Sequence, residues 1–263
     1  MLAFPLDHRR RGLVWELAKR DVLGRYRGAA FGVLWSVLQP FLMLAVYTVA
    51  FGSVLGARWP GVEGTAGFAL VLFVGLIVHG FLAECVSRAP ALVAGNTNYV
   101  KRVVFPLEVL PWPVVLSAGF HLLANLCVLA VVLLASGRGV PPHYLLLPLL
   151  MLPFAAFCVG LVWWVGALSV YFRDLQQLVP PLLTAMLFLS SAIIPPSVVP
   201  ENFALVFALN PLTVPIDAAR AVALDGVMPN WPLWGLHALG CALVFASGLA
   251  VFQRLRRGFA SVL

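Results

Sequence analysis

Charged side chains are scarce in this 263-residue chain, where Asp, Glu, Lys and Arg together make up only 10% of the residues. A soluble domain carries about 25%. Hydrophobic residues account for 62%, above the roughly 45–50% that is usual for soluble domains. A chain this apolar cannot stay soluble as a monomer, so lipid must cover much of its surface.

Cysteines are few and far apart: Cys85, Cys127, Cys158 and Cys241. No CxxC pair occurs, which argues against both a disulfide framework and a zinc site. We therefore expect small buried apolar fillers and no bound metal.

Catalytic motifs are also missing. There is no GxxxxGK[ST] phosphate loop, so the chain does not hydrolyse ATP by that route. No HExxH, GxSxG or paired acidic motif occurs, so we predict no catalytic residues and no enzyme. The ionisable groups within apolar stretches are His79, Glu84, His121 and His237. Such groups are functional candidates by default, but here they show no ligand spacing, and a proton relay or coupling to an ion gradient is not indicated.

The net charge of +7 raises the question of nucleic acid. The basic residues sit in short clusters between long uncharged stretches, which membrane topology explains better than nucleic-acid binding does. The N-terminus has no apolar core followed by a small-residue cleavage site, so we expect no secretory signal.

Long uncharged runs predict an all-α integral membrane protein with six spans. A helix needs about 20 apolar residues to cross the hydrocarbon. The predicted spans lie near residues 33–56, 65–85, 110–136, 144–171, 176–195 and 231–253. They divide the chain into a cytoplasmic N-terminal segment (1–30), a transmembrane domain (31–256) and a cytoplasmic tail (257–263).

The distribution of basic residues predicts the orientation. Six spans place both ends on one side, and 14 of the 17 Lys and Arg residues fall on that side. The other side holds only Arg58, Arg138 and Arg220. By the positive-inside rule both termini are cytoplasmic.

Residues 9–27 predict an amphipathic helix in the cytoplasmic interface. Asp21 and Arg25, four residues apart, can pair with each other or bond to neighbouring helices. A simple membrane anchor is the alternative interpretation of this segment.

Residues 95–108 combine the basic pair Lys101 and Arg102 with apolar residues such as Tyr99 and Phe105 that would be exposed unless a partner covers them. A topogenic loop needs only positive charge, so we favour a docking element for a soluble partner.

Residues 196–230 are rich in proline yet mostly apolar. They predict two short helices, near 201–208 and 213–224, that dip back towards the bilayer and form a gate or vestibule. Asp217 and Arg220 can pair on the second helix. The alternative is a loop lying on the membrane surface.

Four stretches resemble the permeases of type-2 ABC exporters for polysaccharides. They are AKRDVLGRYRGAAFGVLWSVLQP (18–40), NYVKRVVFPLEVLP (98–111), FRDLQQLVP (172–180) and LNPLT (209–213), in the order of the family. The likeness is to O-antigen, or lipopolysaccharide, exporters, with teichoic-acid and capsule exporters close behind.

The resemblance implies a homodimer in the bacterial inner membrane that binds two separate ATPase subunits, which hold ATP and Mg²⁺, while this chain carries no cofactor. The substrate would be a polysaccharide linked to undecaprenyl pyrophosphate, and membrane lipids would surround the dimer. The resemblance places Arg20, Arg25 and Arg27 at the entrance for the lipid pyrophosphate. It also places Asp217 and Arg220 in the periplasmic gate.

By the same likeness, the helix that docks on the ATPase carries four polar or basic residues: Asn98, Tyr99, Lys101 and Arg102. An exporter of small molecules or lipids on the same fold, a membrane-embedded transferase and a structural subunit are the competing hypotheses. The missing catalytic constellation argues against the transferase, and the docking segment argues against a passive subunit.

Overall fold

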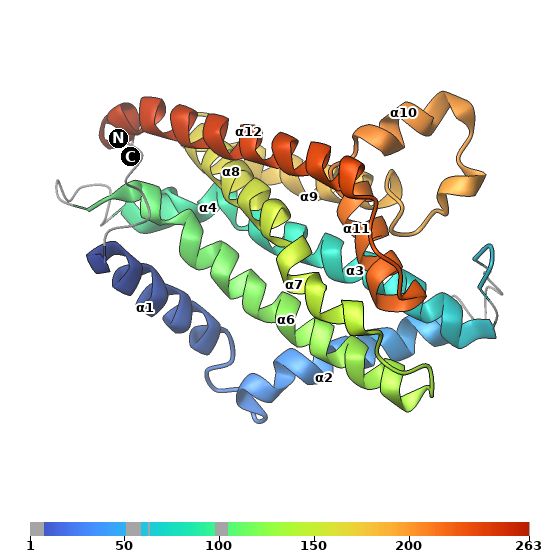
Figure 1. Ribbon diagram of the computed structural model, residues 1–263. Coiled ribbons are helices and arrows are strands. Elements are labelled where there is room, and N and C mark those ends of the chain that lie inside the picture. The colour runs from blue at the N-terminus through green and yellow to red at the C-terminus, as the bar shows by residue number, and fades with distance from the viewer. Residues whose placement is uncertain (1–7, 51–58, 63, 98–104, 263) are drawn as a thin grey trace.

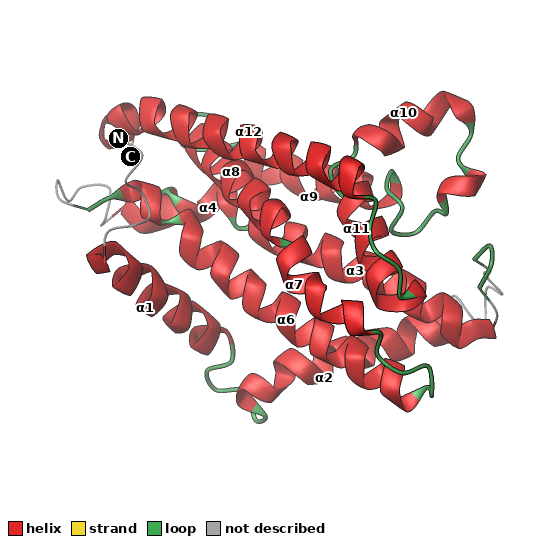
Figure 2. Cartoon of the chain, in the orientation of Figure 1, coloured by secondary structure: helices red, strands yellow, loops and turns green. Residues whose placement is uncertain are grey.

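The computed structural model describes residues 8–50, 59–62, 64–97 and 105–262. Throughout these residues the chain is helical, with turns and short loops between the helices (Figure 2). The prediction of an all-α membrane protein is confirmed.

The helices form one elongated bundle (Figure 1). The longer ones are α1 (His8–Arg25), α2 (Trp35–Tyr47), α3 (Gly64–Ser87), α6 (Pro111–Ala135), α8 (Leu152–Leu168), α9 (Leu175–Phe188) and α12 (Trp231–Leu255). The shorter ones are α4 (Ala89–Leu92), α7 (Leu147–Leu150), α10 (Glu201–Leu209), α11 (Thr213–Arg220) and α13 (Phe259–Val262). α1 begins and α12 ends at the same end of the bundle.

Five helical segments of the described chain are long and apolar enough to cross a membrane: Gly32–Ala50, Gly64–Leu92, Leu107–Ala135, Pro142–Leu168 and Trp231–Gly258. They correspond to five of the six predicted spans. The chain is therefore a multi-pass membrane protein.

The fifth predicted span, residues 176–195, is too long. α9 has 14 residues, about 21 Å at 1.5 Å per residue, and ends at Phe188. Its last carbonyl groups are capped early, because the side-chain amide of Asn210 donates to the carbonyl oxygens of Met186 (2.9 Å) and Leu189 (2.8 Å). The uncharged run 175–200 thus includes a turn that composition alone does not reveal.

The two short helices predicted between the last spans are confirmed as α10 and α11. They are bent by 87° at the break between Leu209 and Thr213, as in a broken span or a re-entrant loop.

α3 is the central helix of the bundle and α2 and α12 lie at its edge. In the segment that contains α3, 72% of the most apolar 18-residue stretch is buried, whereas in the segments that contain α2 and α12 the buried share is 17%. A helix that is apolar all round belongs in a core. The exposed apolar side chains of α2 and α12 instead face lipid or a second protein.

α8 and α12 pack closely over much of their length (Figure 1). At the crossing, Gly160 and Gly248 meet backbone to backbone: a Cβ atom on Gly160 would lie 2.6 Å from the carbonyl oxygen of Val244, and one on Gly248 would clash with the backbone of Gly160. Small residues let membrane helices approach in this way. Both glycines are therefore packing positions.

Replacing Gly248 by Leu should force the two helices apart and destabilise the protein by about 3 kcal/mol, the upper end of the cost of overpacking. The matched control is Gly240→Leu on the same helix, where nothing lies within 4 Å of an added Cβ atom. We expect a lower melting temperature in detergent for Gly248→Leu alone; equal melting temperatures of the two variants would contradict this account of the crossing.

Candidate functional site

Two ion pairs join α1 to the end of α3 and to the turn residue that follows it. Arg88 Nη2 lies 2.5 Å from Asp21 Oδ1, and Arg25 Nη1 lies 2.5 Å from Glu84 Oε1. Asp21 and Arg25 are four apart on α1 and so share a face, and Glu84 and Arg88 are four apart across the end of α3. Asp21 and Arg25 therefore bond to a neighbouring helix, one of the two alternatives that the sequence left open.

Asp21 is held ionised by this arrangement. Burial alone would raise its pKa, but the hydrogen bond from Arg88, a further bond from Ser117 and the charges of Arg88 and Arg25 outweigh it and lower the pKa below 3.8. A carboxylate with a lowered pKa stabilises the folded state above its ordinary pKa, and this contribution is lost as the pH falls through the lowered value. At neutral pH the pair with Arg88 is therefore intact.

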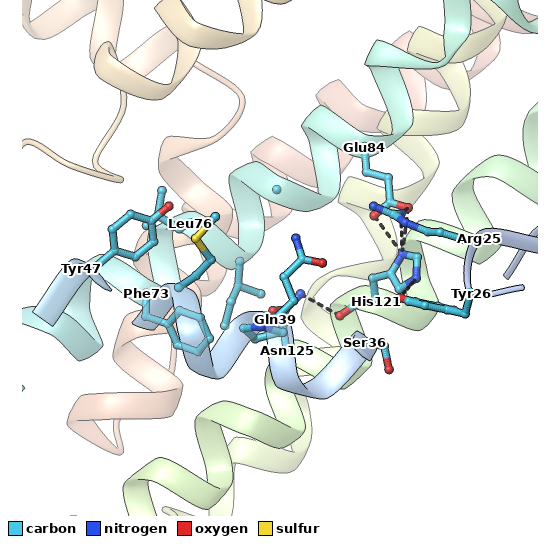
Figure 3. A pocket seen from close by; sticks show the side chains of 14 residues that line it. Arg25, Tyr26, Ser36, Gln39, Tyr47, Phe73, Leu76, Glu84, His121 and Asn125 are labelled. Carbon is cyan, nitrogen blue, oxygen red and sulfur yellow. Dashed lines mark hydrogen bonds and ion pairs between the residues drawn. The ribbon is translucent and has the colours of Figure 1, made fainter. Parts of the chain in front are cut away.

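Glu84 also meets His121 of α6. His121 Nδ1 lies 2.8 Å from Glu84 Oε1, and His121 Nε2 lies 2.9 Å from the hydroxyl oxygen of Tyr26 (Figure 3). Nδ1–H of the imidazole donates to the Glu84 carboxylate, and Nε2 shares a hydrogen bond with the Tyr26 hydroxyl. Arg25 and His121 thus converge on one carboxylate, and α1, α3 and α6 are tied together.

A cavity of about 200 Å³ opens beside this cluster, between α2, α3 and α6; it is called the polar cavity for the charged and amide groups along it, and Pro40, Met43, Leu76 and Ile77 supply apolar parts of its lining. Figure 3 shows the charged cluster at one end, the amides of Gln39 and Asn125 in the middle, and the rings of Tyr47 and Phe73 at the other end.

A second, basic cavity of about 840 Å³ lies between α1, α3 and α9. Its charged wall holds Arg20, Asp21, Arg25, Glu84 and Arg88, and its apolar wall includes Ala83, Pro180, Leu183 and Leu187. Arg25 and Glu84 line both cavities, so their ion pair borders both.

The structure brings two of the three predicted entrance residues together. Arg20 and Arg25 line the basic cavity, whereas Arg27 lies exposed in the turn after α1 and lines neither cavity. Arg88 supplies the third guanidinium instead. The sequence placed Arg88 only among the cytoplasmic basic residues, because nothing local shows that it faces α1.

Glu84 and His121 were identified in the sequence as separate candidates, and the contact between them was not predicted. The signal was present, since ionisable groups within spans mark functional sites by default. Which of them share a site depends on helix packing that spacing along the chain does not encode.

The predicted gate pair Asp217 and Arg220 is in contact, with 3.8 Å between Arg220 Nη1 and Asp217 Oδ1. Arg220 is also buried and donates to three backbone carbonyl oxygens: Val71 (3.1 Å), Ser191 (2.5 Å) and Ala192 (2.9 Å). It thereby ties the re-entrant segment to α3 and to the turn after α9. The assignment to a gate stays a prediction.

The four predicted docking residues, Asn98, Tyr99, Lys101 and Arg102, lie outside the described residues. The segment that follows them is anchored firmly. Glu108 Oε2 pairs with Arg256 Nη1 at 2.7 Å, and Trp163 Nε1 donates to the carbonyl oxygen of Glu108 at 3.1 Å. These contacts join the turn before α6 to α8 and to the residue that follows α12.

Known proteins of similar sequence indicate which family shares this architecture. Residues 12–224 match the family described as "ABC-2 type transporter". The chain is 30% identical to the O-antigen export system permease protein RfbA of Myxococcus xanthus over 253 residues, which cover 95% of each chain. It is 26% identical to the RfbA permease of Klebsiella pneumoniae, again over 95% of each chain. It is 22% identical to the polysialic acid transport protein KpsM of Escherichia coli, over 91% of this chain and 92% of that protein.

The family match spans most of the chain and agrees with a multi-pass helical bundle that contains no ATP-binding motif. This chain belongs to the ABC-2 type transporter family.

Proposed function

We propose that this chain is the permease subunit of an ATP-driven exporter that moves a lipid-linked polysaccharide of the O-antigen type across the bacterial inner membrane. The observation that carries the proposal is the match over 95% of both chains to permeases named for O-antigen export. The chain then transports rather than catalyses, with both termini in the cytoplasm.

The basic cavity fits such a substrate by its chemistry. Arg20, Arg25 and Arg88 line it with guanidinium groups, and such groups bind phosphate oxygens in pairs. Arg25 and Arg88 also hold Glu84 and Asp21, so the guanidinium groups outnumber the carboxylates by one. The apolar wall from α3 and α9 suits a prenyl chain. A lipid pyrophosphate carries both parts, so we assign the cavity to its entrance. In this assignment Arg88 takes the place that Arg27 was predicted to hold.

Export of a capsule polymer is the second candidate, because the chain also matches polysialic acid transport proteins over 91% of its length. The two candidates differ in the polymer and share the permease role. A teichoic-acid exporter or an exporter of small molecules or lipids has no such observation behind it.

The proposal includes a second copy of the chain and two ATPase subunits. A homodimer is consistent with the exposed apolar side chains of α2 and α12. Residues 98–102 dock on the ATPase in this scheme. The contacts of Glu108 with α8 and α12 would carry motion of the docking segment into the bundle.

Deleting the gene should leave lipid-linked polysaccharide inside the cell, and the intact chain should return the polymer to the surface. The double variant Lys101→Glu and Arg102→Glu should insert in the membrane but lose the ATPase on co-purification, with surface polymer reduced by about a hundredfold or more, since reversed charges at a docking surface cost several kcal/mol.

The matched control is Arg254→Glu with Arg257→Glu, two exposed basic residues at the end of α12. If lipid-linked polysaccharide does not accumulate inside the deletion strain, the proposed substrate class is wrong. Co-purification of the ATPase with the Lys101 and Arg102 variant at the normal level would remove the docking assignment alone.

A further inference from the structure

The polar cavity is a second ligand site with a chemistry different from that of the basic cavity. α2, α3 and α6 all belong to segments able to cross the membrane. Polar groups inside a membrane bundle are costly and mark a pathway or a ligand. Here amides, hydroxyls and rings line one hollow together with apolar side chains such as Met43 and Ile77, which suits a ligand with both polar and apolar faces. A purely apolar chain would leave the polar groups without partners.

The charges at the end of this cavity are matched. Glu84 accepts from both Arg25 and His121, and Tyr26 bonds to the far nitrogen of the His121 ring. The carboxylate is thus already neutralised by a guanidinium. A neutral polar ligand suits such a site better than a cation or an anion does.

The middle of the cavity offers hydrogen-bonding groups that accept as well as donate. Asn125 directs its amide nitrogen to the carbonyl oxygen of His121 at 2.8 Å, which leaves its amide oxygen as an acceptor. Gln39 is exposed on the cavity wall beside it (Figure 3). Hydroxyl groups need this mixture of donors and acceptors.

The far end of the cavity is aromatic. Tyr47 and Phe73 place their rings there, opposite the charged cluster. The C–H face of a sugar ring packs on aromatic rings while its hydroxyls bond to amides. The volume of about 200 Å³ is below the ~300–1,000 Å³ of cavities that hold drug-sized molecules, so the site has room for one sugar ring and not for a chain of them.

The position of the cavity indicates which sugar of a lipid-linked glycan would bind there. Arg25 and Glu84 line both cavities, so a group next to a pyrophosphate in the basic cavity lies beside the polar one. In a lipid-linked glycan that group is the first sugar.

We propose that the polar cavity is a monosaccharide subsite that holds the sugar attached directly to the lipid pyrophosphate. This inference rests on the proposed function and deepens it, because it makes the permease itself read the first sugar of its substrate. The Arg25–Glu84 pair borders both cavities, so both parts of the substrate contact the same two residues.

Binding to two defined probes tests the subsite. The probes are farnesyl diphosphate and the same lipid carrying one N-acetylhexosamine, titrated into the full-length permease with its ATPase in nanodiscs. The sugar should improve affinity by about tenfold, the equivalent of one or two net hydrogen bonds. The double variant Gln39→Leu and Asn125→Leu should abolish this gain and keep the affinity for the bare lipid.

The matched control is Gln253→Leu, an exposed amide of α12 that lines neither cavity. Equal binding of the two lipids to the native protein would overturn the subsite and leave the proposed function standing. The subsite would also be overturned if the sugar still improved the affinity of the variant that carries Gln39→Leu and Asn125→Leu. If neither lipid binds, both the entrance and the subsite fall.

Discussion

Replacing Arg220 by Ala is expected to lower the free energy of unfolding by about 3–5 kcal/mol, the usual cost of removing one partner from a buried ionic network. The guanidinium donates to three carbonyl oxygens on two other segments, lies 3.8 Å from Asp217 and stacks 4.4 Å from the centre of the Trp59 ring. A melting curve of the purified protein in detergent measures the loss.

Arg220→Lys should fail nearly as badly. An ammonium group has no planar fork with which to reach carbonyls on two segments at once. The site is also tight, because a Cβ atom on Gly75 of α3 would lie 2.7 Å from Cα of Ala192. α3 and the turn after α9 thus approach closely, and Arg220 closes the gap from the third side.

The matched control is Arg138→Ala, which removes an exposed arginine from the loop after α6. It should leave the melting temperature unchanged. A melting temperature for Arg220→Ala close to that of the control would show that the re-entrant segment is held by its apolar contacts alone, and the role of Arg220 as its anchor would be lost.

Much of the fold follows from the sequence because the bilayer imposes simple rules. Uncharged runs of about 20 residues become helices, and five such runs did so. The prolines between residues 196 and 229 predicted α10 and α11, since proline breaks the spanning pattern. α9 departed from its predicted length because Asn210, more than twenty residues further on, caps it.

The candidate site was predictable only in part. Arg20 and Arg25 were placed at the entrance through a likeness in residues 18–40, and both line the basic cavity. Arg88 and Glu84 also line that cavity, and His121 bonds to Glu84, but none of these three was predicted at the entrance. Their roles depend on which faces of α3 and α6 turn towards α1, and a helix that is apolar all round gives no sign of this in its periodicity.

Arg25 and Glu84 line both cavities, so their ion pair has two roles. As a contact it holds α1 on α3. It also borders both the basic, amphipathic cavity and the polar one. Variants of this pair should therefore affect stability and export to different degrees, which a residue that only packs would not do.

Reversing either charge should damage the protein strongly. Arg25→Glu places two carboxylates together, and Glu84→Arg gathers guanidinium groups at positions 25, 84 and 88. Because the Arg25 side chain is half exposed, we expect each single variant to lose about 2 kcal/mol of stability, below the full cost of breaking a buried pair. Surface polymer should fall by at least about tenfold, as the loss of 1.4 kcal/mol in substrate binding alone would give.

The double variant, Arg25→Glu with Glu84→Arg, restores opposite charges at the same contact. It should regain about 1–2 kcal/mol of stability, the coupling usual for residues in direct contact. Recovery stays incomplete because His121 then faces an arginine in place of its carboxylate partner. Export should recover less than stability, because the double variant exchanges the positions of the positive and negative charges that the substrate contacts. Full recovery of both would reduce the pair to a structural contact, and additive losses in the double variant would show that the two residues do not act together.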